Sequence, residues 1–378
     1  MIFGIPLEIR SHEYRVGAMP FVVNELVKRG HQVLVEARAG EDSLVSNEAY
    51  EKVGALIVPS SEKLYAQAEV ILKIQGPMPV EYDLIRPDHK IFAFFNFVSN
   101  LELARNLLGK GCSCFAYEMF TTRDGKRPMM AINGEIAGKM AVQQGMFYLE
   151  KQNSGRGKLL AHITGVPPTW VTIIGAGAVG YFAAQMAAQL GAHVVLLDRE
   201  FRRLEEVRNN LPPNVETLLS TEEHLLQVLP QTDLLITAVH QPDARSPVLI
   251  TKKMVSLLPP GSVVVDVAVD RGGNVETSKA TTHANPTFVV DGVIHYCVPN
   301  LAGVVPITAS QALSSAFWPY LERIAEMGFE ESMRQDGELR TGLAIYEGHV
   351  TNPFLAAALS VPVYDLNVEA EEDTDTEP

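Results

Sequence analysis

Three glycines, Gly175, Gly177 and Gly180, have the G-x-G-x-x-G spacing of the phosphate-binding turn in dinucleotide-binding domains. The first glycine permits a tight turn, the second lets a pyrophosphate approach the backbone, and the third lets helix and strand pack closely. Ala176 and Val179 lie between them, so we include both in the candidate cofactor site. An anion bound here would face the free N–H groups of a helix N-terminus.

The sequence around these glycines supplies the elements that such a turn needs. Val171–Ile174 is apolar and rich in β-branched residues, as is typical of a strand buried on both faces, and a helix is expected from about Ala178 to Leu190. A second buried strand, His193–Leu197, ends at Asp198, whose carboxylate can accept hydrogen bonds from ribose hydroxyls. A carboxylate repels the 2′-phosphate of NADP, so the sequence predicts NAD as the cofactor, although Arg199 beside it could soften that preference.

Composition limits the classes of partner. The 378 residues are enough for two domains with substantial cores, and 47% hydrophobic with 20% charged residues is ordinary for a globular protein. A net charge of −14 argues against nucleic acid or an anionic membrane as the main partner. Part of that charge lies in residues 369–378, which carry six acids and no base and which we expect to be a disordered tail.

The three cysteines, Cys112, Cys114 and Cys297, form no recognisable disulfide framework or metal motif, and they fit buried thiols in a reducing cytoplasm. The first residues show no signal peptide, and no apolar run reaches the length of a membrane span. We therefore expect a cytoplasmic protein.

Short buried strands alternate with helices along the chain, which indicates parallel sheets flanked by helices. The fold class predicted is α/β, with two Rossmann-like, doubly wound parallel-sheet domains and a cleft between them. Before the glycine turn, strands are expected at 2–5, 31–36, 55–58, 70–74, 91–95 and 114–117, and helices near 21–29, 47–53, 62–68 and 135–152. Beyond Asp198, strands are expected at 233–239, 262–267 and 292–297, helices near 203–209, 222–229 and 252–258, and a mostly helical segment after Pro306.

Ligands of open parallel sheets bind beyond the carboxyl ends of the strands. This rule places Asp198, Val239 with His240, Val267 with the turn from Val269 to Gly273, and Asn300 around one site in the second domain. The first domain is expected to close over this site from the other side.

The order of motifs resembles the alanine dehydrogenase family, which shares its architecture with the nucleotide-binding subunit of proton-translocating transhydrogenase. The resemblance covers nearly the whole chain except the acidic tail. The stretches that carry it are GIPLEI near the start, HEYRV at 12–16, ELVKRGHQVLVE at 25–36, GRGKLL at 155–160, the glycine turn, GSVVVDVAVDRGGNVETS at 261–278 and TTHANPTFVVDGVIHYCVPN at 281–300.

The resemblance implies a substrate domain of residues 1–128 and 308–370 and an NAD-binding domain of residues 129–307. It also implies reversible oxidative deamination of L-alanine to pyruvate and ammonium in a homo-oligomer, a hexamer or a dimer. Such chemistry needs a cation for the substrate carboxylate, an acid/base group, and donors that polarise the carbonyl.

Several site residues match the family by position. Arg15 corresponds to the arginine that pairs with the substrate carboxylate, a task that suits a bidentate guanidinium. Asp270 corresponds to the aspartate that works beside the nicotinamide, and Asn300 also matches.

Four candidate substrate-binding positions depart from the family together. Gln75 stands where the family has a lysine, and Asn96 where it has a histidine. Asn133 begins the run that corresponds to M-S-E, and Arg271 replaces the glutamine of the D-Q-G-G turn. Gln75 brings no charge, and Asn96 cannot exchange a proton near neutral pH. The sequence therefore predicts a remodelled substrate pocket beside an intact cofactor site.

Asp270 becomes the leading proton carrier if burial raises its pKa; the alternative is an aspartate that only orders its turn. Arg271 either holds a second substrate carboxylate or points to solvent. His240 is a weaker acid/base candidate. The remaining histidines considered are loop or core residues without metal spacing: His12, His283 and His295.

The first functional hypothesis is an NAD-dependent amino-acid dehydrogenase of alanine dehydrogenase type, with a substrate other than alanine or with poorer turnover of alanine. Gln75 and Asn96 motivate an alternative, an NAD-binding homologue that senses NAD without alanine turnover. A transhydrogenase-like transfer of hydride between nucleotides ranks last, because residues 281–300 resemble the dehydrogenases more closely.

Overall fold

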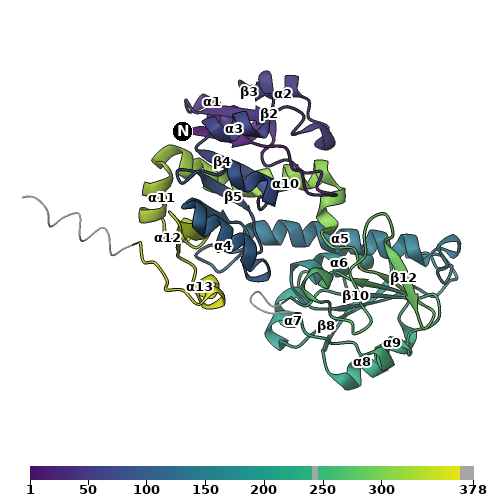
Figure 1. Cartoon of the computed structure of the whole chain (residues 1–378). Coiled ribbons are helices and arrows are strands. Elements are labelled where there is room, and N and C mark those ends of the chain that lie inside the picture. The colour runs from purple at the N-terminus through teal and green to yellow at the C-terminus, as the bar shows by residue number, and fades with distance from the viewer. Residues whose placement is uncertain (241–245, 367–378) are drawn as a thin grey trace, which may run out of the picture. The chain divides into compact units, whose positions relative to one another are not determined.

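The computed structural model describes residues 1–240 and 246–366 and divides into two compact units. Unit 1 comprises Met1–Ile132 with Gly303–Pro378, and unit 2 comprises Asn133–Ala302. Each unit contains one sheet with helices packed around it (Figure 1). The acidic tail predicted for residues 369–378 lies outside the described residues.

The described residues of unit 1 form an eight-stranded sheet in the order β15-β14-β6-β5-β4-β1-β2-β3. Strands β1 to β6 pair in parallel, whereas β14 is antiparallel to both β6 and β15. The strands are β1 (Ile2–Ile5), β2 (Gln32–Glu36), β3 (Leu56–Val58), β4 (Val70–Gln75), β5 (Lys90–Phe94), β6 (Ser113–Ala116), β14 (Leu343–Tyr346) and β15 (His349–Val350). The helices are α1 (Pro20–Lys28), α2 (Asn47–Glu51), α3 (Ser61–Gln67), α4 (Leu101–Lys110), α10 (Pro306–Met327), α11 (Phe329–Gln335), α12 (Gly337–Arg340) and α13 (Pro353–Leu359).

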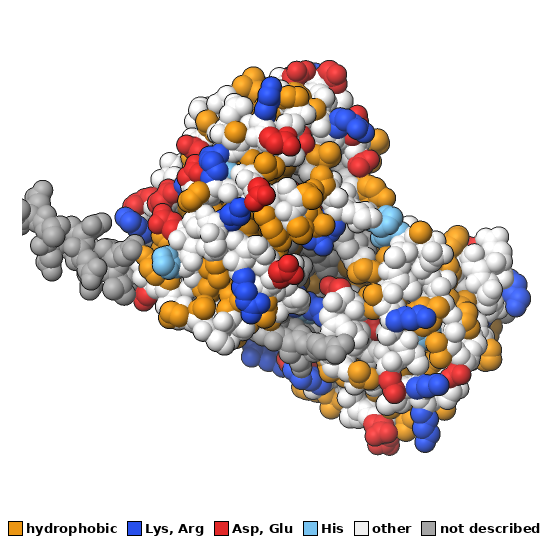
Figure 2. Space-filling view, viewed as in Figure 1, with side chains coloured by type: hydrophobic (Ala, Val, Ile, Leu, Met, Phe, Trp, Pro, Cys, Tyr) orange, Lys and Arg blue, Asp and Glu red, His pale blue; other side chains and the backbone are white. Residues whose placement is uncertain are grey.

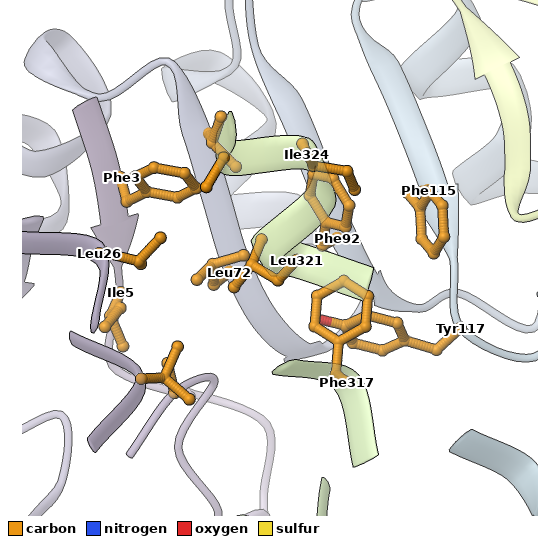
Figure 3. Packing of buried hydrophobic residues seen from close by; sticks show 14 of the residues in the cluster. Phe3, Ile5, Leu26, Leu72, Phe92, Phe115, Tyr117, Phe317, Leu321 and Ile324 are labelled. Atoms are coloured by element: carbon orange, nitrogen blue, oxygen red, sulfur yellow. The ribbon is translucent and has the colours of Figure 1, made fainter. Parts of the chain in front are cut away.

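The larger core of unit 1 lies between this sheet and helix α10. Phe317 and Leu321 of α10 pack with Leu72 of β4 and Phe92 of β5 in one buried cluster (Figure 3). The rings of Phe92 and Phe115 stack with their centroids 4.9 Å apart. Burying several such side chains stabilises the unit by roughly 1.5–3 kcal/mol each. The core thereby fixes the strands whose carboxyl ends carry the candidate substrate residues.

The described residues of unit 2 form a seven-stranded sheet in the order β12-β13-β11-β10-β7-β8-β9. All neighbours pair in parallel except β12, which is antiparallel to β13. The strands are β7 (Trp170–Ile174), β8 (His193–Asp198), β9 (Val215–Leu219), β10 (Leu234–Thr237), β11 (Val263–Asp266), β12 (Thr287–Val290) and β13 (Val293–Tyr296). The helices are α5 (Pro128–Leu149), α6 (Ala178–Gln189), α7 (Phe201–Arg208), α8 (Glu222–Val228) and α9 (Lys252–Val255).

Both sheets contain six parallel strands in the doubly wound order: the third, second, first, fourth, fifth and sixth strands along the chain lie side by side. In unit 2 the switch point lies between β7 and β10, which is where such sheets bind a nucleotide. The prediction of two Rossmann-like, parallel-dominated sheets is confirmed.

Four strands and one helix were not predicted. The described segment beyond Pro306 is mostly helical, as predicted, but it also contains β14 and β15, which extend the first sheet. Strands β9 and β12 are only partly buried, so they lack the apolar run that marks a central strand, and α4 was overlooked despite its Asn100 N-cap. Helix α5 begins at Pro128 rather than near 135, with proline in the first turn, where no N–H is needed.

Asp233, at the amino end of β10, anchors the connector that precedes β7. Its fully buried carboxylate pairs with Arg156 (Nη1–Oδ1, 3.0 Å) and Lys158 (Nζ–Oδ2, 2.9 Å), and it accepts the Trp170 N–H. These two cations belong to the GRGKLL stretch, so that motif has a structural role at the end of the sheet opposite the glycine turn.

Replacing Asp233 with asparagine should destabilise the protein by about 2–4 kcal/mol, because two cations lose their buried counter-charge. Urea-induced unfolding measures the change. Asp291→Asn removes the same charge from an exposed position of unit 2 and should leave the stability within about 0.5 kcal/mol. Equal unfolding midpoints for the two variants would contradict the anchoring role.

None of the described helices is both long and apolar enough to cross a membrane. Acidic and basic side chains are interspersed on the visible surface of the two units (Figure 2).

Candidate cofactor and substrate sites

The structure requires glycine at two of the three positions in the turn after β7, and leaves the third, Gly177, unconstrained. Gly175 has φ +104°, and a Cβ there would lie 2.8 Å from the Ala238 carbonyl oxygen. A Cβ on Gly180 would lie 1.7 Å from the Gly175 carbonyl oxygen, so any side chain would push α6 off the strand. Gly177 has an ordinary φ of −70°, and a Cβ there would meet only the Arg203 guanidinium, at 3.9 Å. The fold itself does not require glycine here, so the lack of a side chain fits a ligand that approaches the backbone.

Asp198 lies at the end of β8, with its carboxylate beside the glycine turn. One oxygen accepts the Ala176 N–H at 2.7 Å, and the other accepts the Glu200 N–H at 2.9 Å. Each carboxylate oxygen has a further lone pair, so the same group can accept hydrogen bonds from a ribose. Arg203 of α7 was not predicted, because only the fold brings it to within 3.9 Å of the Cβ position on Gly177.

A buried amide, Asn274, and a buried carboxylate, Asp266, order the chain at the carboxyl ends of β10 and β11. Asn274 accepts the Val239 N–H at 3.0 Å and donates its amide N–H groups to the carbonyl oxygens of Val239 (2.9 Å) and Pro247 (3.0 Å). Asp266 accepts the N–H groups of Asn274 (2.8 Å) and Val275 (3.1 Å). Together they fix Val239, Pro247 and the turn after β11. Sequence reasoning missed both, although a polar residue ending an apolar run such as VVVD is a usable signal.

Asp270 lies in that turn, in the short 3₁₀ segment Val269–Arg271. Its side chain is reached by solvent, yet partial desolvation by the surrounding protein raises the pKa of the carboxyl, and Arg271 only partly opposes this. Gly272 and Gly273 follow with φ +103° and +79°, which lets the chain reverse at once. The turn thus presents a carboxyl group that holds a proton more readily than an ordinary aspartate.

The other predicted residues of unit 2 lie on the same edge or next to it. His240 is exposed after β10, Val267 is half-buried after β11, and Asn300 is exposed after β13 with φ +55°. Val179 lies in the first turn of α6, and Asn133 is half-buried in α5. The sheet therefore brings the predicted cofactor residues to the carboxyl ends of β7, β8, β10, β11 and β13.

Arg15 lies in the loop after β1, and its side chain is buried. Its Nε donates to Glu13 Oε1 at 2.6 Å, and its Nη2 donates to Glu13 Oε2 at 2.5 Å, in a bidentate pair. Gln75, at the end of β4, donates its Nε2–H to Glu13 Oε2 at 3.0 Å. The Ser310 hydroxyl of α10 accepts a hydrogen bond from the Val16 N–H at 3.1 Å, which fixes the position of this loop. Two predicted residues, Arg15 and Gln75, thus meet through Glu13, which was not predicted.

A second buried ionic group lies beside the first. Lys73 Nζ is 2.9 Å from Glu81 Oε1 and 3.5 Å from Glu8 Oε2. Glu8 also accepts the Ile74 N–H at 2.6 Å, and Tyr65 donates to Glu81 at 3.0 Å. Desolvation raises the pKa of Glu8, with Glu13 and Glu81 adding to the effect against Lys73. Burial lowers the pKa of Lys73, but its two carboxylate partners outweigh this, so its pKa is raised.

Asn96 follows β5 with φ +52°, a left-handed conformation that asparagine tolerates better than most residues. Its N–H donates to Glu118 Oε1 at 2.7 Å. The carboxyl ends of β1, β4 and β5 thus carry Glu8, Gln75 and Asn96 to one edge of the first sheet.

The described residues contain no group of three or more His, Cys, Asp or Glu side chains that could hold a metal ion. His12 and His283 are half-buried, and buried His295 shares a hydrogen bond of 2.7 Å with the Thr277 hydroxyl. The three cysteines are buried free thiols.

The doubly wound sheet of unit 2 and its three-glycine turn define a protein of the dinucleotide-binding class. The family model for the alanine dehydrogenase/PNT N-terminal domain matches residues 4–137, and the model for the alanine dehydrogenase/PNT C-terminal domain matches residues 141–353. The chain belongs to the alanine dehydrogenase/PNT family.

Curated relatives and solved structures agree with this assignment. The chain is 42% identical to an alanine dehydrogenase of Halomonas elongata over 96% of this chain and 97% of that protein. It is 41% identical to an alanine dehydrogenase of Bacillus subtilis over 95% of each chain. Its structure is similar to that of an L-alanine dehydrogenase, with a TM-score of 0.91, 38% identity and coverage of 95% and 99%. A transhydrogenase structure from Sinorhizobium meliloti gives a TM-score of 0.80, 26% identity and coverage of 93% and 99%.

Proposed function

We propose that this protein is an NAD-dependent amino-acid dehydrogenase of alanine dehydrogenase type with an altered substrate pocket. The observation that carries the proposal is the Asp270 turn, in which a solvent-accessible carboxyl with a raised pKa follows a strand of the dinucleotide-binding sheet. The family to which the chain belongs, and the names of its relatives, support the same reaction class.

The residues of unit 2 fit NAD. The open space at Gly177 and the N-terminus of α6 suit a pyrophosphate, and the Asp198 carboxylate suits an adenosine ribose. NAD, when bound, supplies the hydride acceptor for the oxidation. The turns of Val239 and of Asp270 would bind the nicotinamide end, positioned by the Asn274 and Asp266 clamps.

The residues of unit 1 would bind the amino acid, so we propose the substrate domain there, with residues 1–128 and 308–370, and the NAD domain at 129–307. Arg15 would contact the substrate carboxylate, positioned by its bidentate pair with Glu13. Asp270 would take a proton from the substrate amine or from the water that hydrolyses the imine, and would return it in the reverse reaction.

NADH formation, followed by absorbance over a panel of L-amino acids with NAD, tests the function. The reverse reaction is followed with 2-oxo acids, ammonium and NADH. NAD binding by calorimetry without turnover on any member of the panel would support the alternative, a nucleotide-binding homologue without catalysis, which the neutral Gln75 and Asn96 favour.

NAD should be preferred over NADP by at least about a hundredfold in kcat/KM, because the Asp198 carboxylate repels a 2′-phosphate. Asp198→Asn keeps an acceptor for the turn but removes the charge, and it should reduce the preference at least tenfold. Initial rates with both nucleotides measure the ratio. Glu205→Gln, an equal charge change at an exposed position of α7, serves as the control. An unchanged ratio in Asp198→Asn would contradict the assignment.

The double change Gln75→Lys and Asn96→His should raise alanine oxidation at least tenfold, because it restores a cation and a titratable group at the edge of the first sheet. Histidine is among the residues that accept the φ of +52° at position 96. NADH production from L-alanine measures the gain, and circular dichroism checks the fold. A folded double variant without any gain would mean that the pocket differs from its relatives at more than these positions.

We also propose a cytoplasmic homo-oligomer. Exposed apolar side chains of unit 2 support self-association: Phe147, Leu159, Ile163 and Val166. Light scattering on the purified chain would give the oligomeric state, and a monomer at micromolar concentration would contradict it.

A further inference from the structure

Glu13 links two of the candidate substrate-binding side chains, Arg15 and Gln75. Its side chain is fully buried, and its carboxylate accepts two hydrogen bonds from the Arg15 guanidinium, one from the Arg15 backbone N–H and one from the Gln75 amide. The Arg15 guanidinium is also buried, at 1% exposure, so its positive charge is balanced at contact distance by a carboxylate in the same dry environment. The α-carboxylate that Arg15 would contact is common to alanine and to every other amino acid, so specificity depends on the group that the substrate side chain brings beside this ion pair.

Gln75 has a fixed polarity in this arrangement. A carboxylate only accepts hydrogen bonds, so the amide must turn its NH₂ group toward Glu13, as the 3.0 Å bond shows. The half-buried side chain therefore offers its carbonyl oxygen, an acceptor, to a ligand. A lysine at this position would offer a cationic donor. Gln75 can therefore accept a hydrogen bond from a donor group of the substrate, whereas a lysine would donate one to an acceptor group.

The buried charges around this group favour the same kind of ligand. Among the described residues of unit 1, the buried carboxylates are Glu8, Glu13, Glu36, Glu81 and Glu118, and the buried cations of lysine and arginine are Arg15 and Lys73. Neighbouring carboxylates act on both groups: Glu13 and Glu81 add to the desolvation that raises the pKa of Glu8, and Glu8 and Glu81 raise the pKa of Lys73 against the effect of burial. A positive group on the substrate side chain would gain from this imbalance, and a negative one would lose.

We propose that Glu13 and Gln75 determine substrate specificity by selecting an amino acid with a second ammonium group, a diamino acid, over alanine. The second ammonium would donate to the Gln75 carbonyl oxygen and lie near Glu13, while Arg15 stays paired with Glu13 and contacts the α-carboxylate. The inference rests on the proposed dehydrogenase function and names the substrate class for the same site.

The test uses the full-length protein and compares L-alanine with L-2,3-diaminopropionate, L-2,4-diaminobutyrate and L-ornithine in the NADH assay. At least one diamino acid should exceed alanine by tenfold or more in kcat/KM. Gln75→Lys should lower that ratio at least tenfold, mainly through a higher KM for the diamino acid, because it replaces an acceptor with a cation. Gln67→Lys adds the same charge at an exposed position of α3 and should leave the ratio unchanged.

Better use of alanine than of all three diamino acids by the unmodified protein would overturn the inference while leaving a dehydrogenase. So would a ratio that does not move in Gln75→Lys. Calorimetric titration of each amino acid into the protein with NADH separates binding from turnover. Tighter binding of a diamino acid than of alanine, with no NADH production from any, would support the specificity and overturn the proposed catalysis. Equal or weaker binding would overturn the specificity.

Discussion

Replacing Asp270 with asparagine should lower kcat for amino-acid oxidation by about 10²–10⁴-fold, because the amide cannot exchange a proton. NAD affinity should stay within about threefold, since the turn is fixed by Asp266 and Asn274 rather than by the Asp270 side chain. NADH absorbance gives the rate, and calorimetry gives the affinity. Asp291→Asn is the matched control at an exposed position of the same unit. A rate within threefold of the unmodified protein would reduce Asp270 to a turn-forming residue.

The same assignment has a pH signature. Desolvation raises the pKa of Asp270 above the aspartate value of about 3.9, so its basic form is lost at a higher pH than for an exposed aspartate. Oxidation needs that basic form, and kcat/KM should therefore fall as the pH decreases through the raised pKa. Asp270→Asn should flatten this acidic limb in whatever residual rate it keeps.

The glycine turn gives the second large effect, and it separates folding from binding. A Cβ on Gly180 would lie 1.7 Å from a backbone oxygen, so Gly180→Ala should destabilise the protein by about 3 kcal/mol or more. A Cβ on Gly177 meets only a flexible guanidinium, so Gly177→Ala should change stability by less than about 1 kcal/mol. Its NAD affinity should nevertheless fall about tenfold or more, because the pyrophosphate loses its approach to the backbone.

Urea-induced unfolding and calorimetric NAD titration measure the two effects on the same preparations. The result that contradicts this interpretation is a stable Gly180→Ala protein, or a Gly177→Ala protein that binds NAD normally. The first result would mean that α6 and β7 do not approach as closely as described, and the second that the pyrophosphate does not approach the backbone at Gly177.

The sequence predicted the cofactor-binding turn of unit 2 because the residues that form it lie close together in the chain. Val171–Ile174, the three glycines and Asp198 lie within one continuous stretch, and each residue acts through its own backbone conformation or its position after a strand. The doubly wound order then brought the turns after β10, β11 and β13 to the same edge without further information.

The sequence predicted the substrate unit only in outline, because its side chains depend on partners that lie far away in the sequence. The loop bearing Glu8, Glu13 and Arg15 has the composition of an exposed segment, and only the fold supplies Lys73 and Gln75 from β4 as its partners. No periodicity in the sequence links positions 8 and 73. The substitution at Gln75 was visible, but its bond to Glu13, and hence the polarity it offers a ligand, was not.

Strand β14 has a consequence for how the chain is made. Leu343–Tyr346 covers the edge of β6, and α10 covers Phe92 and Phe115, yet both are translated after the whole of unit 2. During translation, one edge of β6 therefore keeps unpaired backbone groups, and one face of the sheet keeps exposed apolar side chains, until more than half of the polypeptide has been synthesised after β6. A nascent chain of this kind is exposed to wrong pairing for longer than one whose first sheet closes in order, which makes its late segments a determinant of soluble yield.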